Sequence, residues 1–312
     1  MSNIPASSRR PLHRRVLAWV ARVVGVVVGL AALGVGAAYG VTARRFATPF
    51  VIPQHELAVA PDPSLVARGR HLAQVRGCTD CHGDQLGGRV LVDDPAVGRL
   101  ISSNLTNGGR GLELEATDWE RAVRHGVRRD GTPLMFMPAQ DFTQLSDADV
   151  AALVSYARSL PAVHDSARIT RVGPLGRVLY IAGLIPLVPA EMITHAATHA
   201  APPAEAATPE FGKFMASTCF GCHGEGLSGG KMPGTPAEAK PPRNLTPDST
   251  TGIGRWTEEQ FVTALSTGRR PDGSAIDATQ MPIRMTAAMT DTERRAIYRY
   301  LRTIPPKPFG NR

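Results

Sequence analysis

The stretches GCTDCHG at residues 77–83 and CFGCHG at residues 219–224 contain every cysteine of this 312-residue chain. Each has the pattern Cys-x-x-Cys-His, which is typical of covalent haem c attachment. Two thiols at this spacing add across the two vinyl groups of one porphyrin, and the imidazole that follows reaches the iron. The sequence therefore predicts two covalently bound haem c groups. Their attachment residues and proximal ligands would be Cys78, Cys81, His82, Cys219, Cys222 and His223.

Other uses of paired cysteines fit these motifs less well. A zinc ribbon separates its pairs by about 15–20 residues, whereas Cys219 follows Cys78 by 141 positions. A dithiol redox motif does not require a histidine after the second cysteine in both stretches. A disulfide framework would not repeat in this way across a chain of this size.

The segments around the two motifs repeat as well. The order of the matching segments is kept and their offset varies only between 140 and 144 residues, which indicates a tandem duplication. The matching pairs are 104–106 with 244–246, 129–131 with 271–273, 137–138 with 281–282, 145–149 with 289–293, and 159–161 with 303–305.

Both copies have the pattern of helical domains. Helices are expected to begin at Pro63, at the capping boxes Thr117/Glu120 and Thr257/Gln260, and at the capping boxes Ser146/Asp149 and Thr290/Glu293. The middle helices should end at Gly126 and Gly268. Neither copy shows a convincing strand pattern. The predicted fold class is all-α.

A haem iron with one protein ligand binds a second one or stays open. Each copy offers a methionine in a Met-Pro pair at matching positions, Met137 and Met281, and a thioether ligand suits an electron carrier. The alternative is that these methionines only fill the core. Nearby methionines that could substitute are Met135, Met285 and Met289.

The N-terminal region has the pattern of a membrane anchor. Residues 23–41 carry no charge and are long enough to span a bilayer as a helix. Arginines precede this span, so residues 1–22 are expected in the cytoplasm and the remainder across the membrane. The alternative is a cleaved signal peptide. Residues 1–45 hold seven arginines and no acid, so the net charge of +8 leaves only +1 on the rest, which argues against a nucleic-acid partner.

The segment between the copies is different in character. Residues 175–189 are apolar but too short to span a membrane. They are expected to form a short helix packed between the two copies, or else an exposed apolar surface that touches lipid or a partner. His195 and His199 have the i, i+4 spacing of metal ligands on a helix, although they adjoin a proline-rich linker and structural roles are favoured.

With these motifs the sequence resembles the class I cytochrome c family, and in particular membrane-anchored dihaem c-type cytochromes of bacteria. The resemblance covers residues 62–307. It implies two small helical haem domains with His and Met axial ligands, in which the last helix packs on the helix before the haem motif. The expected organisation is 1–22 cytoplasmic, 23–41 transmembrane, 42–61 linker, 62–163 first domain, 164–208 interdomain segment and 209–307 second domain.

The resemblance implies one-electron transfer rather than enzymatic catalysis. The chain would be a single-pass protein of the bacterial inner membrane, with both haem domains in the periplasm and redox proteins as donor and acceptor. It would act as a free carrier or as the cytochrome subunit of a dehydrogenase or oxidase complex. The alternative is an enzyme similar to dihaem cytochrome c peroxidases, which needs one haem iron that can become five-coordinate. The matching Met-Pro pairs argue against it.

Overall fold

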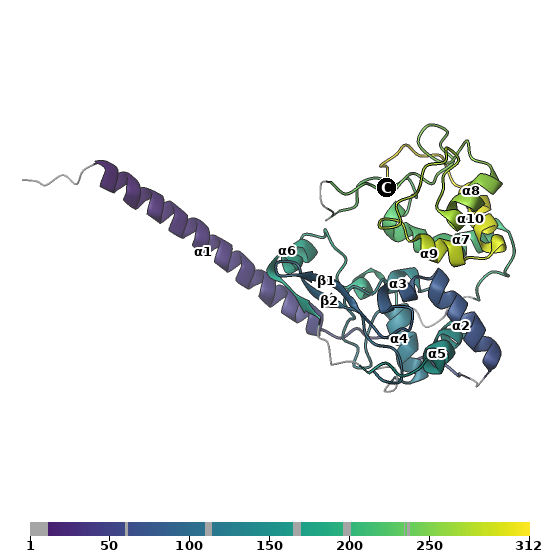
Figure 1. Cartoon of the computed structure of the whole chain (residues 1–312). Coiled ribbons are helices and arrows are strands. Elements are labelled where there is room, and N and C mark those ends of the chain that lie inside the picture. The colour runs from purple at the N-terminus through teal and green to yellow at the C-terminus, as the bar shows by residue number, and fades with distance from the viewer. Residues whose placement is uncertain are drawn as a thin grey trace, which may run out of the picture.

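The computed structural model describes residues 12–59, 62–109, 114–164, 170–195, 201–233, 235 and 238–312. A long helix projects from a body in which the helices of the first copy (blue and teal) lie beside those of the second (green and yellow; Figure 1). The first eleven residues of the predicted cytoplasmic segment and His199 lie outside the described residues.

The projecting helix, α1 (Leu12–Ala47), is 36 residues long. At 1.5 Å per residue it extends over about 54 Å, more than the ~30 Å hydrocarbon core of a bilayer. Its large apolar side chains are exposed along nearly the whole length, and it is apolar and long enough to cross a membrane. The predicted span, residues 23–41, lies within it.

The first copy begins with α2 (Pro63–Val75), whose N-cap Asp62 accepts a hydrogen bond from the amide of Ser64. Gly77, with φ of +74°, interrupts the helix after Arg76, and α3 (Cys78–His82) then carries the first haem motif. Three more helical elements of this copy follow, namely α4 (Ala116–His125), the 3-10 turn η2 (Ala139–Asp141) and α5 (Asp147–Ser159).

In the second copy α7 (Pro209–His223) continues without a break through the second motif. The residue that corresponds to Gly77 there is Thr218, which remains helical. The copy is completed by α8 (Glu258–Thr267), α9 (Ile283–Ala288) and α10 (Asp291–Leu301).

Three of the four predicted capping boxes are confirmed, at Ser146, Thr257 and Thr290. The box predicted at Thr117 and Glu120 is wrong. The structure has Glu115 at the N-cap and Asp118 at the third helical position. Glu120 is instead buried one turn further on, because its carboxylate pairs with Arg124 and His125 inside the domain.

Each copy is held together by the same crossing of its first and last helices. A Cβ added to Gly69 of α2 would lie 1.9 Å from the carbonyl oxygen of Ala152 in α5. A Cβ added to Gly212 of α7 would lie at the same distance from the carbonyl oxygen of Ala296 in α10. Only glycine permits this approach of the two backbones. The packing of the last helix on the helix before the motif is therefore confirmed in both copies.

A small sheet that the sequence analysis did not predict joins the first copy to the interdomain segment. β1 (Val90–Asp94) pairs antiparallel with β2 (Gly98–Ile101), which pairs antiparallel with β3 (Arg171–Val172). The carboxylate of Asp94 accepts hydrogen bonds from the amides of Ala96 and Val97 and closes the turn between the first two strands. These strands are too short to show a clear alternation of apolar and polar residues.

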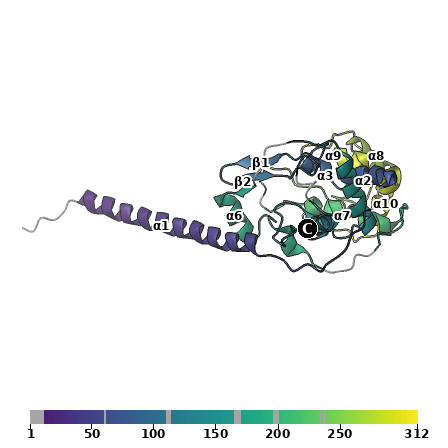
Figure 2. The same ribbon diagram turned by 90° about the horizontal axis from the view of Figure 1, so that it is seen from below.

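The interdomain segment forms α6 (Pro174–Ile181) and the 3-10 turn η3 (Pro189–Met192). A short helix was expected here, but its position differs from the expectation. α6 packs against α1 and β2 at the base of the projecting helix, apart from the labelled helices of the second copy (Figures 1 and 2).

The buried apolar residues form two clusters. The larger cluster is shared by both copies and includes the faces of α2, α5, α7 and α10. The smaller cluster lies at the base of α1, and its buried members are Ile52, Leu100, Val127, Val172, Tyr180, Leu187, Val188 and Ala190. The two copies therefore have a common core, and α6 belongs to a separate one.

The two copies pack around an approximate two-fold axis. α2 contacts α9, and α7 contacts η2. Because α7 is the counterpart of α2 in the repeat and α9 is the counterpart of η2, these are equivalent contacts. A reciprocal pair of this kind is the mark of an isologous interface.

Candidate functional site

Both Cys-x-x-Cys-His motifs are helical, in α3 and at the end of α7. Residues three apart lie on the same side of a helix, so the two sulfurs of each motif face one way. Cys78 and Cys219 pack against the core shared by the two copies. The first cysteine of each motif thus lies at an equivalent place, beside the shared core.

The two motif histidines are oriented in the same way. Nδ1 of His82 donates to the carbonyl of Ser103 at 2.8 Å, and Nδ1 of His223 donates to the carbonyl of Arg243 at 2.7 Å. A proton held on Nδ1 leaves the lone pair of Nε2 available to a metal, which is how proteins set the tautomer of a ligating histidine. Burial lowers the pKa of both imidazoles and so favours this neutral form.

The carbonyl that accepts from His82 belongs to a tightly fixed loop. The side-chain oxygen of Asn104 accepts from the backbone amide and the hydroxyl of Thr106. The amide nitrogen of Asn104 donates to the carbonyl of Val163 beyond α5. These bonds hold the backbone just after Ser103 in place.

The second copy repeats the arrangement. The side-chain oxygen of Asn244 accepts from the amide of Thr246, and its nitrogen donates to the carbonyl of Lys307. Both asparagines thus close a turn with the residue two positions later. These asparagines fix the loops whose carbonyls accept from the motif histidines. That role could not be predicted, because backbone carbonyls carry no sequence signal.

The two Met-Pro pairs share one backbone geometry. Pro138 has φ −77° and ψ 60°, and Pro282 has φ −74° and ψ 76°. In each case the residue after proline donates its amide hydrogen to the methionine carbonyl at 2.7 Å, which is an inverse γ-turn. Met137 and Met281 are half-buried and pack against the shared core. The matched turns give Met137 and Met281 the same backbone setting in their domains.

The alternative methionines have different surroundings. Met135 packs against the small cluster at the base of α1, away from the shared core. Met285 and Met289 are buried in the shared core. A Cβ added to Gly77 would lie 3.5 Å from Sδ of Met285, so this sulfur lies at the contact between copies. These positions favour Met137 and Met281 as the equivalent pair.

A buried indole of the first domain fits the presence of a prosthetic group. Trp119 is 5% exposed, and its Nε1 has no hydrogen-bond partner among the described residues. Buried donors are almost always paired in native proteins. The Nε1–H of Trp119 therefore fits a polar group of a bound cofactor.

The cysteine sulfurs suit neutral thioethers. Burial raises the pKa of Cys78 to about 12 and that of Cys219 to about 11, so thiolates are disfavoured there. No group of three or more His, Cys, Asp or Glu side chains that could hold a metal ion occurs among the described residues. His195 contacts His125, with 3.0 Å between their Nδ1 atoms, so a metal role for it is not supported.

The two motifs lie close to the contact between copies. A Cβ added to Gly221 in the second motif would lie 3.6 Å from a carboxylate oxygen of Asp141 in η2. Asp141 is the counterpart of Met285, which approaches Gly77 of the first motif. Burial raises the pKa of Asp141 to about 6. Each motif is thus bordered by the η2 or α9 element of the other copy.

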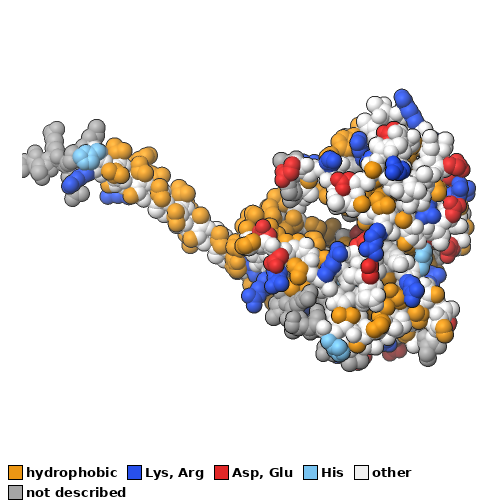
Figure 3. Space-filling model, in the orientation of Figure 1, with side chains coloured by type: hydrophobic (Ala, Val, Ile, Leu, Met, Phe, Trp, Pro, Cys, Tyr) orange, Lys and Arg blue, Asp and Glu red, His pale blue; other side chains and the backbone are white. Residues whose placement is uncertain are grey.

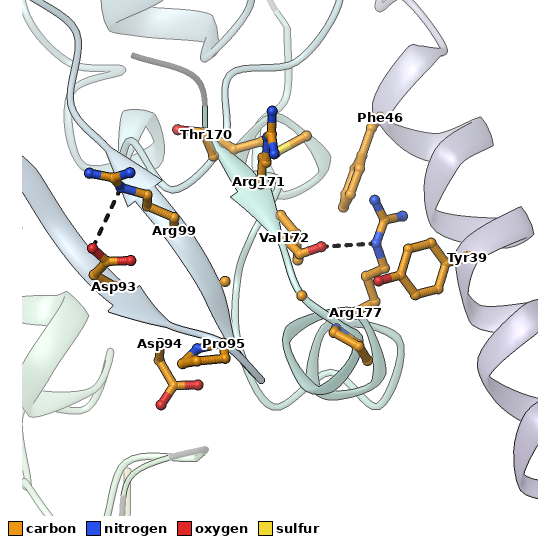
Figure 4. A pocket seen from close by; sticks show the side chains of 14 residues that line it. Tyr39, Phe46, Asp93, Asp94, Pro95, Arg99, Thr170, Arg171, Val172 and Arg177 are labelled. Atoms are coloured by element: carbon orange, nitrogen blue, oxygen red, sulfur yellow. Dashed lines mark hydrogen bonds and ion pairs between the residues drawn. The ribbon is translucent and has the colours of Figure 1, made fainter.

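A separate pocket lies away from both motifs. It has a volume of about 590 Å³ and lies between α1, the small sheet and the start of α6. Its lining includes Tyr39, Phe46, Arg99, Arg171 and Arg177 (Figure 4). No cysteine or histidine of the motifs lines it, so it belongs to the base of the projecting helix.

Comparison with known proteins divides the chain in the same way as its repeat. Residues 64–156 match the family model described as cytochrome c oxidase, cbb3-type, subunit III. Residues 212–305 match the cytochrome c family model.

Relatives that match most of the chain are subunits of dehydrogenases. The cytochrome c subunit of a quinone alcohol dehydrogenase from Gluconobacter oxydans is 28% identical over 283 residues, 80% of this chain and 56% of the relative. The cytochrome c subunit of gluconate 2-dehydrogenase from Pantoea cypripedii is 26% identical over 276 residues, 78% of this chain and 60% of the relative. The chain therefore spans somewhat more than half the length of these relatives.

Proposed function

We propose that this chain, which carries two cytochrome c domains, transfers single electrons as the cytochrome subunit of a membrane-bound dehydrogenase complex. The observation that carries the proposal is the matched orientation of His82 and His223. Their Nε2 atoms are prepared to bind iron in the same way. The dehydrogenase subunits that the relatives' names imply support the choice of complex.

Each domain would hold one haem c through its own motif. The thioether bonds would form at Cys78 and Cys81 in the first domain and at Cys219 and Cys222 in the second. The haem supplies a reversible one-electron couple when bound. The axial ligands of the iron atoms would be His82, Met137, His223 and Met281.

The protein residues would then set the reduction potential of each haem and would not take part in making or breaking bonds of a substrate. The Ser103 and Arg243 carbonyls fix the imidazoles, and the inverse γ-turns fix the thioethers. A thioether ligand raises the reduction potential of a haem. With both axial ligands supplied by the protein, the iron would offer no position to a substrate. The relatives are cytochrome subunits and not peroxidases, so the peroxidase hypothesis is set aside.

The pseudo-two-fold packing supports a direct path between the two domains. Gly77 and Gly221 both face the other copy within van der Waals reach of a side chain. Electrons would pass between the domains through this contact, with one domain facing the dehydrogenase and the other its acceptor.

The chain would be anchored through α1, with both domains in the periplasm. The exposed apolar side chains of this helix need a lipid environment. Arginines before the apolar stretch favour a cytoplasmic N-terminal side. An anchor confines the carrier to the membrane plane and raises its effective concentration near its partners.

The test is to produce the full chain in a bacterium with an active cytochrome c maturation system. The expected product has the mass of the chain plus two haems, which stay bound under denaturing conditions. A redox titration should then show two high-potential couples. A colourless product with the mass of the bare chain would contradict the proposal, as would two low-potential couples typical of bis-histidine ligation.

A further inference from the structure

The helix α6 has an apolar face that the body leaves uncovered. This face consists of Leu175, Val178 and Ile181, and Leu184 in the turn after the helix continues their three-residue spacing; each of the four is at least 40% exposed. The opposite side is fixed to the sheet, because a Cβ added to Gly176 would lie 2.2 Å from the carbonyl oxygen of Val97. Tyr180 is buried on that same side and donates to Glu191. The outward direction of the apolar side chains is therefore set by packing.

Arg177 attaches α6 to the projecting helix. Its guanidinium carbon lies 4.1 Å from the ring centre of Tyr39 and 5.3 Å from that of Phe46, both in α1. Its Nε donates to the carbonyl of Val172 in β3 (Figure 4). The guanidinium also bonds to the hydroxyl of Thr42 in α1. Cation–π contacts and hydrogen bonds of this kind hold α6 at one level along α1.

The residues of α1 that Arg177 contacts lie where the apolar span of α1 ends. The uncharged stretch runs through residues 23–41, and Arg44 and Arg45 follow within one turn. Aromatic and basic side chains at the end of a span are typical of the boundary between acyl chains and headgroups. Contacts to Tyr39, Thr42 and Phe46 place α6 at this boundary.

The apolar surface is continuous between the two helices. In Figure 3 hydrophobic side chains cover α1 and extend onto the part of the body where α1 joins it. A soluble surface rarely leaves four large aliphatic side chains of one short segment exposed together. A lipid surface already reaches this level if α1 is anchored, and it would cover the face without any further partner.

We infer that α6 is an interfacial membrane helix, and that its Leu175, Val178 and Ile181, together with Leu184 in the turn that follows, insert between lipid headgroups beside the end of α1. This inference rests on the proposed anchoring of α1. It adds a second contact with the membrane, which fixes the tilt of the first domain relative to the bilayer. A single helix would leave the body free to rotate about the anchor, whereas two contacts prevent this.

Site-directed spin labelling of the full haem-loaded chain tests the inference. All four natural cysteines are committed to haem in the proposed function, so an introduced cysteine is the only free thiol. The variants are Val178→Cys and Ile181→Cys on α6, Val28→Cys as the lipid control on α1, and Ser249→Cys as the water control on an exposed loop of the second domain. Each labelled protein is reconstituted into vesicles of phosphatidylcholine and phosphatidylglycerol.

Collision rates with oxygen and with a water-soluble nickel chelate are then measured. At positions 178 and 181 nickel collisions should fall by roughly a factor of five or more below those at position 249, because apolar side chains of interfacial helices lie about 5–10 Å inside the headgroup boundary. Nickel collisions equal to those at position 249, with position 28 shielded, would overturn the inference and leave the anchor intact. Nickel access at position 28 as well would overturn both.

Discussion

Arg76 donates a hydrogen bond from its guanidinium to the hydroxyl of Ser217 at 3.0 Å, and the two residues occupy the same position of the two repeats. Each lies two residues before the first cysteine of its motif. Equivalent residues meet only near a two-fold axis. The axis of the pseudo-symmetric pair therefore passes between the two haem motifs.

Arg76 is buried at this axis and makes several contacts across it. The guanidinium donates to the carbonyl of Phe214 at 3.1 Å and lies 4.3 Å from the centre of its ring. A buried charge without an acid beside it is costly unless such dipoles and rings surround it. The duplication has thus diverged at one position so that a single arginine joins both copies.

The first prediction concerns the substitution Arg76→Leu. The substitution removes two charge-assisted hydrogen bonds, to the Phe214 carbonyl and the Ser217 hydroxyl, which then keep only the bond between themselves. We expect a loss of about 1–3 kcal/mol in the free energy of unfolding. Removal of a positive charge between the motifs should also lower both haem potentials, because that charge favours the reduced state. Chemical denaturation and redox titration measure the two effects. Arg70→Leu, on the exposed side of the same helix, is the control and should change neither.

The second prediction concerns the helix crossings. Gly69→Ala and Gly212→Ala each push a methyl group against a backbone carbonyl, because their Cβ atoms would lie 1.9 Å from Ala152 and Ala296 oxygens. Backbone cannot yield as a side chain does, so each should destabilise its own domain by about 3 kcal/mol or more. Thermal unfolding followed at the haem absorbance measures this. Gly36→Ala in α1, where nothing lies within 4 Å, should leave unfolding unchanged.

Much of this architecture could be predicted from the sequence because its signals are local. The haem motifs, the repeat, three capping boxes and the apolar helix each occupy a short window with a defined spacing. The Thr117 box failed because Glu120 has a stronger tertiary use beside Arg124 and His125. A rule based only on residue spacing does not show that Glu120 forms these ion pairs instead of a capping box.

The remaining features depend on contacts between distant segments. β3 reaches β2 over some seventy residues, and the strands are too short to be recognised before they meet. The carbonyls of Ser103 and Arg243 hold the motif histidines, yet any residue could supply a carbonyl. The position of α6 was missed because its buried side is chosen by Gly176 and Arg177, which carry no apolar signal.

The third prediction separates the proposed iron ligand from its neighbour. Met137→His should remove the methionine–iron charge-transfer band of the first haem and lower its potential, because imidazole favours the oxidised iron more than a thioether does. Met135→Leu is the matched control two residues away, and its side chain packs in the other cluster. Retention of the band in the Met137 variant together with its loss in the Met135 variant would reassign the ligand.

The last prediction concerns a hydrogen bond that joins the two copies. Nε2 of His71 in α2 lies 2.8 Å from Oε1 of Glu293 in α10. The hydrogen bond to Glu293 raises the pKa of His71. Burial opposes ionisation of Glu293, yet the bond from His71 lowers its pKa overall. Both groups are therefore charged in the folded protein over a wider pH range than in the unfolded chain.

The sign of the pH dependence follows from these two shifts. The contribution of His71 is complete below its ordinary pKa of 6.5 and is lost as the pH rises through its raised value. The contribution of Glu293 is complete above its ordinary pKa of 4.5 and is lost as the pH falls through its lowered value. The pair should stabilise the contact between copies most between the ordinary pKa values of 4.5 and 6.5.

A double-mutant cycle of His71→Gln and Glu293→Gln measures the coupling between the two side chains. Glutamine at position 293 preserves the capping box with Thr290. We expect a coupling of about 1–2 kcal/mol near pH 5.5 that shrinks well above neutral pH. A coupling that is constant from pH 5 to pH 9 would contradict a charged pair.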